Sequence, residues 1–167
     1  AFATYALGFV ARPLGGLVFG HYRDKIGRKR FLLVSAVLFF VSAIGCALPR
    51  TMAVFLLFRF IGGLGIGSAS ILSPLYISEI SPARIRGALV SVNQMAIVTG
   101  ILLAYFVNWM FAGTGPSNWR WMFGSGAVPS ILFFALVLRV PESPRWLVKQ
   151  GREGEAREIL TRVDAAK

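Results

Sequence analysis

The sequence predicts an all-α membrane protein with five transmembrane helices, followed by short amphipathic helices. Its 167 residues are 56% hydrophobic and only 15% charged, whereas a typical soluble domain carries about 25% charged residues. The mean hydropathy is +0.66. The basic residues, which give a net charge of +11, gather between apolar segments. In a membrane protein this arrangement is a topology signal, so we do not expect nucleic acid as a partner.

Five apolar segments are long enough to cross the lipid bilayer as helices. A spanning helix needs about 20 mainly apolar residues, with a usual range of about 17 to 25. The tail after Pro141 is polar, which predicts a transmembrane bundle over residues 1–140 and a soluble helical region over 141–167. The predicted spans cover residues 1–21, 31–48, 52–78, 88–112 and 121–140.

The positions of Lys and Arg predict on which side of the membrane each loop lies. Five of them lie in residues 22–30, two in residues 81–87, and seven from Arg139 onward. An alternating path of five spans places these three regions on one side, and cytoplasmic loops carry the excess of Lys and Arg. We therefore expect a multi-pass protein of the plasma membrane, or of the inner membrane in a bacterium. The chain would start outside and end in the cytoplasm, with a further helix preceding it.

Two arginines, Arg12 and Arg59, lie inside predicted spans, and no Asp or Glu lies within the five apolar cores. A charge in hydrocarbon is costly, so such a residue is paired inside the protein or lines a watered cavity, and it is a functional candidate by default. If the partner of Arg59 is a carboxylate, it must come from chain outside this sequence. Backbone carbonyls or water are the alternative. Arg12 likewise needs a partner or water.

No pattern in the sequence predicts an enzyme. Cys46 is alone in an apolar run, which excludes a disulfide within the chain and favours inert packing. The one histidine, His21, lies at a membrane edge. Neither a nucleophile beside a base nor a cluster of metal ligands is visible. We therefore expect no catalytic residue, no metal and no cofactor.

The fourth predicted span carries several polar side chains. Amides donate and accept hydrogen bonds, which suits a neutral solute with many hydroxyl groups. They can equally link neighbouring helices, and for Asn93 and Asn108 this structural role is favoured. The polar residues of the span are Asn93, Gln94, Thr99 and Asn108.

The polar tail predicts two short helices. Ser143 and Pro144 are a suitable N-cap and first helical residue, and Gly151 is suited to end that helix. These helices would lie against the cytoplasmic face, or would anchor to the membrane surface. The second helix carries an apolar stripe of Ala156, Ile159, Leu160 and Val163.

Several ordered motifs resemble those of the sugar porters of the major facilitator superfamily. From Arg59 to Leu160 the chain is especially similar to bacterial xylose or hexose proton symporters. Its start, GFVARPLGG, looks more like the second helix of metabolite–proton symporters of the same superfamily, and Arg12 has no role in the sugar-porter pattern. The matching motifs are Asp24-x-x-Gly27-Arg28-x-Arg30, Arg59-x-x-Gly62-Gly63, SPLYISEISPARIRG, Asn93-Gln94, NWRWMF and PESPRWL.

The resemblance implies that the five spans are helices two to six of a twelve-helix transporter. They would form most of its N-terminal six-helix bundle, and the tail would begin the intracellular helical domain. Gln94 matches a glutamine that binds sugar hydroxyls, and Ile97 lines the same pocket. Arg59 matches an arginine that pairs with the proton-coupling aspartate of the first helix. The cytoplasmic gating network would comprise Asp24, Arg28, Arg30, Glu79, Arg86, Glu142 and Arg145.

The function implied by this resemblance is transport of a monosaccharide by alternating access, with proton symport first among the alternatives. The expected partners are a small neutral sugar, protons, the lipid bilayer and the remaining helices of the same transporter. Facilitated sugar uniport is the second hypothesis, because Ile101 stands where some symporters keep a second glutamine. A sugar sensor that does not transport, or a transporter of another small metabolite, is the third.

Overall fold

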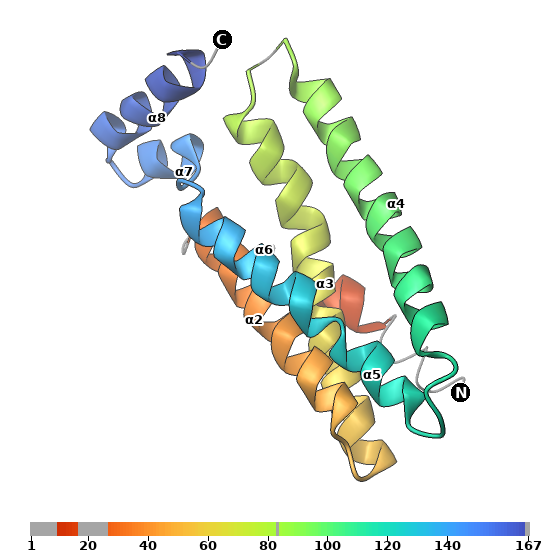
Figure 1. The fold of residues 1–167 in the computed structure, drawn as a ribbon. Coiled ribbons are helices and arrows are strands. Elements are labelled where there is room, and N and C mark those ends of the chain that lie inside the picture. Colours follow the sequence, from red (N-terminus) through yellow and green to blue (C-terminus); the bar gives the residue numbers. More distant parts are fainter. Residues whose placement is uncertain (1–9, 17–26, 83, 166–167) are drawn as a thin grey trace.

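The predicted all-α fold is confirmed in the computed structural model, which describes residues 10–16, 27–82 and 84–165. Residues 10–16 are helical. Most of the first predicted span lies outside the described residues, as do Asp24 and His21. The remaining helices, drawn in Figure 1, are α2 (Arg28–Ala47), α3 (Met52–Ile80), α4 (Arg86–Phe111), α5 (Asn118–Gly124), α6 (Ala127–Arg139), α7 (Pro144–Lys149) and α8 (Glu153–Ala165).

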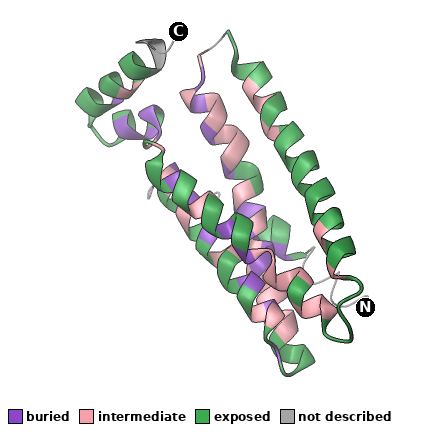
Figure 2. Ribbon diagram, in the orientation of Figure 1, coloured by how far each residue is buried: buried purple, intermediate pink, exposed green. Residues whose placement is uncertain are grey.

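Four stretches among the described residues are long and apolar enough to cross a membrane. They are α2, α3, α4 and the combined stretch of α5 and α6. Figure 1 shows α2, α3 and α6 side by side, with α4 standing apart and α7 and α8 beyond one end. Figure 2 shows how unevenly these helices are buried, because α2 carries buried residues along its length, α3 carries them from Gly62 to Glu79, and α4 carries none.

The last predicted span is interrupted in the structure. It starts three residues earlier than predicted, at Asn118, and is broken between α5 and α6. Pro129 explains the break, because it has no N–H to donate to the carbonyl of Ser125. That carbonyl accepts from the N–H of Val128 instead, at 3.2 Å. The hydroxyl of Ser130 donates to the carbonyl of Gly126 at 2.6 Å, so the backbone polar groups near the break find partners.

Glycines let α3 approach its neighbours closely. An added Cβ on Gly65 would lie 3.1 Å from the carbonyl oxygen of Ser35 in α2. On the other side, an added Cβ on Gly15 would lie 2.5 Å from the carbonyl oxygen of Leu64. Such small-residue contacts replace the hydrophobic effect as the means of packing helices within lipid. The main apolar core forms where α2, α3 and α6 meet, and consists of Phe31, Leu32, Leu72, Tyr76 and Val137.

The first of the two tail helices begins and ends where the sequence predicts. Ser143 is the N-cap of α7 and Pro144 its first residue. Gly151 follows the helix with a φ of 75°, a conformation that favours glycine. The N–H of Gly151 donates to the carbonyl of Val148 and the N–H of Arg152 to that of Leu147, which is a Schellman motif. A second cluster, Trp146, Leu147 and Ala156 with Ile159 against it, joins α7 to α8.

Replacing Gly67 by Ala should destabilise the full-length protein that contains this chain. The added Cβ would overlap the backbone of Arg12, including its carbonyl oxygen, and overpacking of this kind costs about 1–3 kcal/mol. Thermal unfolding in detergent measures the effect as a lower Tm. Gly100→Ala in α4 is the matched control, because nothing lies within 4 Å of that Cβ. Equal Tm values for the two variants would contradict the close contact at Gly67.

Candidate functional site

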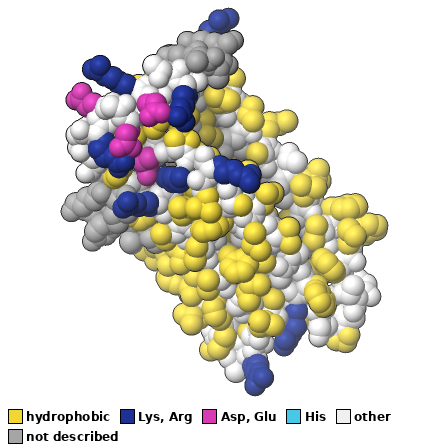
Figure 3. Space-filling view, turned by 60° about the vertical axis from the view of Figure 1, so that its left-hand side comes forward, with side chains coloured by type: hydrophobic (Ala, Val, Ile, Leu, Met, Phe, Trp, Pro, Cys, Tyr) yellow, Lys and Arg dark blue, Asp and Glu magenta, His cyan; other side chains and the backbone are white. Residues whose placement is uncertain are grey.

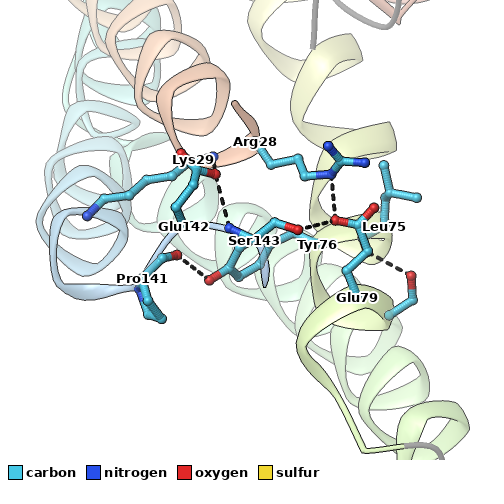
Figure 4. A network of polar contacts seen from close by, with 9 residues as sticks. Arg28, Lys29, Leu75, Tyr76, Glu79, Pro141, Glu142 and Ser143 are labelled. Carbon is cyan, nitrogen blue, oxygen red and sulfur yellow. Dashed lines mark hydrogen bonds and ion pairs between the residues drawn. The ribbon is translucent and has the colours of Figure 1, made fainter. Parts of the chain in front are cut away.

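A buried carboxylate at one end of the bundle joins three parts of the chain. Oε2 of Glu79, in the last turn of α3, lies 2.5 Å from Nε of Arg28 at the start of α2. The hydroxyl of Ser143 donates to the same oxygen, also at 2.5 Å. The side chains of Arg28 and Glu79 are only 6% and 3% exposed. Figure 4 shows this carboxylate between the arginine and the serine. An isolated charge in such a place would be costly, and the ion pair with its added hydrogen bond offsets that cost.

A second carboxylate, that of Glu142, fixes the linker between α6 and α7. Its Oε1 accepts from the backbone N–H of Lys29 at 2.9 Å and from that of Ser143 at 3.1 Å. Gly27 has a φ of 108°, and an added Cβ there would lie 2.8 Å from Oε2 of Glu142. Glycine is therefore required at this position by both its backbone and its surroundings. The hydroxyl of Tyr76 donates to the carbonyl of Pro141 at 2.6 Å, which ties the linker to α3 as well.

The structure brings together only some of the residues predicted for the cytoplasmic network. Arg28, Glu79 and Glu142 take part in the contacts above, and Asp24 lies outside the described residues. Arg30, Arg86 and Arg145 are exposed and form no ion pair with another described residue. Figure 3 shows side chains of both charges gathered at this end of the molecule, beside a broad apolar surface.

Three members of the network were not predicted from the sequence. Lys29 contributes its backbone N–H, and its Nζ donates to the carbonyl of Leu138 at 2.9 Å. Tyr76 lies within an apolar stretch of the sequence, which gives no sign that its hydroxyl makes a polar contact. Ser143 was predicted only as a helix cap, yet its side chain makes no capping hydrogen bond and donates to Glu79 instead. The one local signal is the motif Pro141-Glu142-Ser143-Pro144, which could have indicated that Ser143 has a role besides capping the helix.

Arg59 lies half-buried in α3, within the part of the bundle that would cross the membrane. Its guanidinium carbon lies 5.1 Å from the ring centroid of Phe123, a cation–π contact. Its Nε is buried and has no hydrogen-bond partner among the described residues. Arg59 lines a cavity of about 520 Å³ together with Arg12, Ser42 and Cys46, and none of its described lining residues is acidic.

The predicted sugar-binding residues lie on α4. Ile97 lines a second cavity of about 470 Å³, whereas Gln94 is exposed on the helix surface. Asn93 lines the cavity with Ile97, and its Oδ1 accepts a hydrogen bond from the hydroxyl of Ser73 in α3 at 3.0 Å. The predicted role of Asn93 in linking two helices is therefore confirmed.

The described residues hold no group of three or more His, Cys, Asp or Glu side chains that could bind a metal ion. The candidate site has two parts, a charged network at one end of the bundle and a cavity within the bundle that Arg12 and Arg59 line. Such side chains can bind a ligand, orient it, and form or break ion pairs when the protein changes conformation.

Residues 2–167 match the family described as "Sugar (and other) transporter". The chain therefore belongs to this family of the major facilitator superfamily, whose members are transporters and not enzymes. It is a multi-pass membrane protein.

The chain is 47% identical over 150 residues to the probable inositol transporter 3 of Arabidopsis thaliana, covering 90% of this chain and 26% of that protein. It is 42% identical over 174 residues to the D-xylose-proton symporter of Escherichia coli K12, covering 90% of this chain and 35% of that one. The structure of the proton:xylose symporter XylE bound to 6-bromo-6-deoxy-D-glucose matches with a TM-score of 0.91 at 40% identity. That match covers 96% of this chain and 39% of XylE.

Replacing Glu79 by Gln should destabilise the full-length protein strongly. The change removes a negative charge that the buried guanidinium of Arg28 contacts at 2.5 Å, and breaking a buried pair costs about 3–5 kcal/mol. Thermal unfolding in detergent would show this as a lower Tm. Glu155→Gln is the matched control, because its pair with Arg152 is exposed and such pairs contribute less than about 1 kcal/mol. If both variants unfold at the wild-type temperature, Glu79 has no structural role.

Proposed function

We propose that the protein containing this chain carries a monosaccharide across the membrane by alternating access, coupled to protons. The observation that carries the proposal is the similarity, in sequence and over nearly the whole fold, to a proton:xylose symporter. The chain spans 26% and 35% of the two curated relatives named above, so the remaining helices complete the pathway. In such transporters the solute binds near the middle of the membrane between two bundles, which rock around it.

The charge distribution supports a cytoplasmic location for the end that carries Glu79, α7 and α8. Loops at that end hold most of the Lys and Arg residues, as the positive-inside rule requires. At the other end of the bundle, Trp109 in the last turn of α4 is 72% exposed and Trp121 in α5 is 60% exposed. Exposed tryptophans suit the membrane–water interface. In this arrangement residues 1–140 belong to the transmembrane bundle, and residues 141–167 begin an intracellular helical domain in the cytoplasm.

Gln94 and Ile97 are proposed to face the sugar from α4. Both are exposed in this chain, which leaves them free to meet a solute or another helix. The amide of Gln94 would bind hydroxyl groups, and Ile97 would form an apolar wall of the same pocket. The second cavity supports the placement of Ile97, because polar side chains line it as well, namely Ser35, Ser70, Ser73, Asn93 and Ser130.

Arg59 is proposed to take part in proton coupling. Its Nε has no hydrogen-bond partner among the described residues, which agrees with a carboxylate partner from another helix of the transporter. Protonation of that carboxylate would release the arginine, and rebinding of the two groups would follow proton loss. Such an ion pair can bias the two conformations differently, as a coupling device must.

The network around Glu79 and Glu142 is proposed to hold the cytoplasmic side closed while the pocket faces outward. Its polar contacts join α2, α3 and the linker to α7 within this half. Arg30, Arg86 and Arg145 are exposed at the same end, where they are available to the other half of the transporter.

Uptake into proteoliposomes tests the proposal directly. The full-length protein should accumulate a sugar when an inward pH gradient is imposed, and a panel of pentoses, hexoses and inositol would identify it. Equal uptake with and without the gradient would favour facilitated uniport. Saturable sugar binding without any uptake would favour a sensor, and the absence of binding to any sugar would contradict the proposal.

Replacing Gln94 by Ala should weaken sugar binding by about 10-fold or more. Two lost hydrogen bonds of about 0.5–1.5 kcal/mol each would produce such a loss. Titration of the purified full-length protein with the transported sugar measures the dissociation constant. Gln150→Ala removes an exposed glutamine after α7 and should leave the constant unchanged. Undiminished affinity in Gln94→Ala would remove Gln94 from the binding site.

Replacing Arg59 by Ala should abolish accumulation driven by the pH gradient and spare exchange of sugar across the membrane. The carboxylate partner would then no longer link proton binding to the change of conformation. Uptake with and without a gradient, compared with sugar counterflow, separates the two activities. Arg50→Ala serves as the control, because Arg50 is exposed in the turn before α3. Gradient-driven accumulation that survives in Arg59→Ala would remove the coupling role.

A further inference from the structure

The guanidinium of Arg59 lies against an aromatic ring from another helix. Its carbon is 5.1 Å from the ring centroid of Phe123, which belongs to α5. A cation within about 6 Å of a ring centroid is attracted by the partial negative charge of the ring face. Arg59 and Phe123 are both half-buried and line the same cavity. Partial burial strengthens the attraction, because less water competes for the guanidinium.

Interleaved aromatic side chains hold the ring of Phe123 in place. Phe55 and Arg59 are four residues apart in α3, and Trp119 and Phe123 are four residues apart in α5. Each pair therefore lies on one face of its helix. The ring of Phe55 meets that of Phe123 edge-on with the centroids 5.3 Å apart, and that of Trp119 edge-on at 6.1 Å. Such edge-to-face contacts stabilise a defined ring orientation.

The start of α5 is itself tied to the turn before α3. Nη2 of Arg120 donates to the carbonyl of Pro49 at 3.2 Å, and its guanidinium lies 5.0 Å from the ring centroid of Trp119. The side chain of Thr51 caps α3 by accepting from the N–H of Val54 at 3.4 Å. Residues of this chain alone therefore position the ring that faces Arg59.

The ring contact and the proposed ion pair respond differently to a proton. Protonation would remove the negative charge of the carboxylate partner and leave the ring of Phe123 unchanged. The other charged or titratable residues among the described cavity lining are Arg12, which is exposed, and Cys46, whose thiol donates to the carbonyl of Phe55. Neither supplies a negative charge. The ring thus stabilises Arg59 most when the carboxylate is protonated, and such a difference between two states shifts their populations.

From these contacts we infer that Phe123 is a positioning residue for proton coupling, and that its ring holds the guanidinium of Arg59 while the partner carboxylate is protonated. The inference deepens the proposed function and rests on it, because it assigns a second partner to the coupling arginine. Loss of the ring makes the proton-loaded state less stable, so a higher proton concentration is needed to reach it.

The test measures the initial rate of sugar uptake by the full-length protein in proteoliposomes against external pH, with the internal pH held constant. The sugar is whichever pentose, hexose or inositol the wild-type protein accumulates. Phe123→Leu should move the pH of half-maximal uptake about one unit lower, which corresponds to a tenfold higher proton concentration. Phe123→Tyr should keep the wild-type midpoint, because it keeps the ring face.

Trifluorophenylalanine in place of Phe123 separates the electrostatic contact from packing. Fluorine withdraws electron density from the ring face and changes the shape of the ring little, which weakens the attraction for a cation. The midpoint should move in the same direction as in Phe123→Leu, with a Tm in detergent close to that of the wild type. Phe111 provides the matched control, because its ring stacks on that of Trp121, with the centroids 6.4 Å apart. The same replacement there should leave the midpoint unchanged.

Three results would overturn the inference. One is a wild-type midpoint in both the Phe123→Leu protein and the fluorinated protein. Another is a midpoint that moves equally on fluorination of Phe123 and of Phe111, and the third is a shift in Phe123→Leu and Phe123→Tyr that fluorination does not reproduce. In each case, accumulation by the wild-type protein under a pH gradient would leave the proposed symport standing. Wild-type uptake that does not depend on pH would count against proton coupling itself, and so against both proposals.

Discussion

The arrangement of the described chain depends on one buried ion pair at its charged end. Glu79 lies in the last turn of α3, and its carboxylate contacts Arg28 of α2 and Ser143, the N-cap of α7. Removal of either charge would break a buried ion pair, which is costly, so the pair favours one relative position of the three segments. The alignment of α2 with α3, the path of the linker and the docking of α7 all follow from that position.

Small residues hold the helices close together further along the bundle. Packing within lipid gains little from the hydrophobic effect, so helices associate where backbones can come close. Gly65 and Gly67 provide such contacts for α3, with α2 on one side and the segment of Arg12 on the other. The ion pair sets the register at one end, and the glycines keep the helices close enough for a cavity lined by arginines to form between them. If the helices lay further apart, Arg12 and Arg59 would not line the same cavity.

The sequence was sufficient for the elements and insufficient for the contacts. Apolar runs and charge predicted the helices, and local rules placed the N-cap at Ser143 and the end of α7 at Gly151. Arg28 and Glu79 are 51 positions apart, and no periodicity indicates that they meet; only the family resemblance did. The break before α6 was missed because an apolar run hides the effect of Pro129. The hydroxyl of Ser143 was assigned to the helix end because a local rule cannot see a buried carboxylate from another helix, which is a stronger acceptor.

The charged groups around Glu79 and Glu142 have partners of opposite or complementary charge within the chain, whereas the arginines inside the bundle do not have an acidic residue beside them among the described residues. At the end that carries α7, the carboxylates of Glu79 and Glu142 have cationic or N–H partners within the chain, so that region can be stable without a ligand. Inside the bundle, Arg12 and Arg59 line one cavity, and none of its described lining residues is acidic. Arg59 is half-buried there, and its Nε has no hydrogen-bond partner among the described residues. Burial of a charge is costly unless it is paired, so the coupling role proposed for Arg59 requires a carboxylate from another helix of the transporter. The contacts at the charged end are therefore supplied by this chain itself, whereas the surroundings of Arg59 depend on the rest of the bundle.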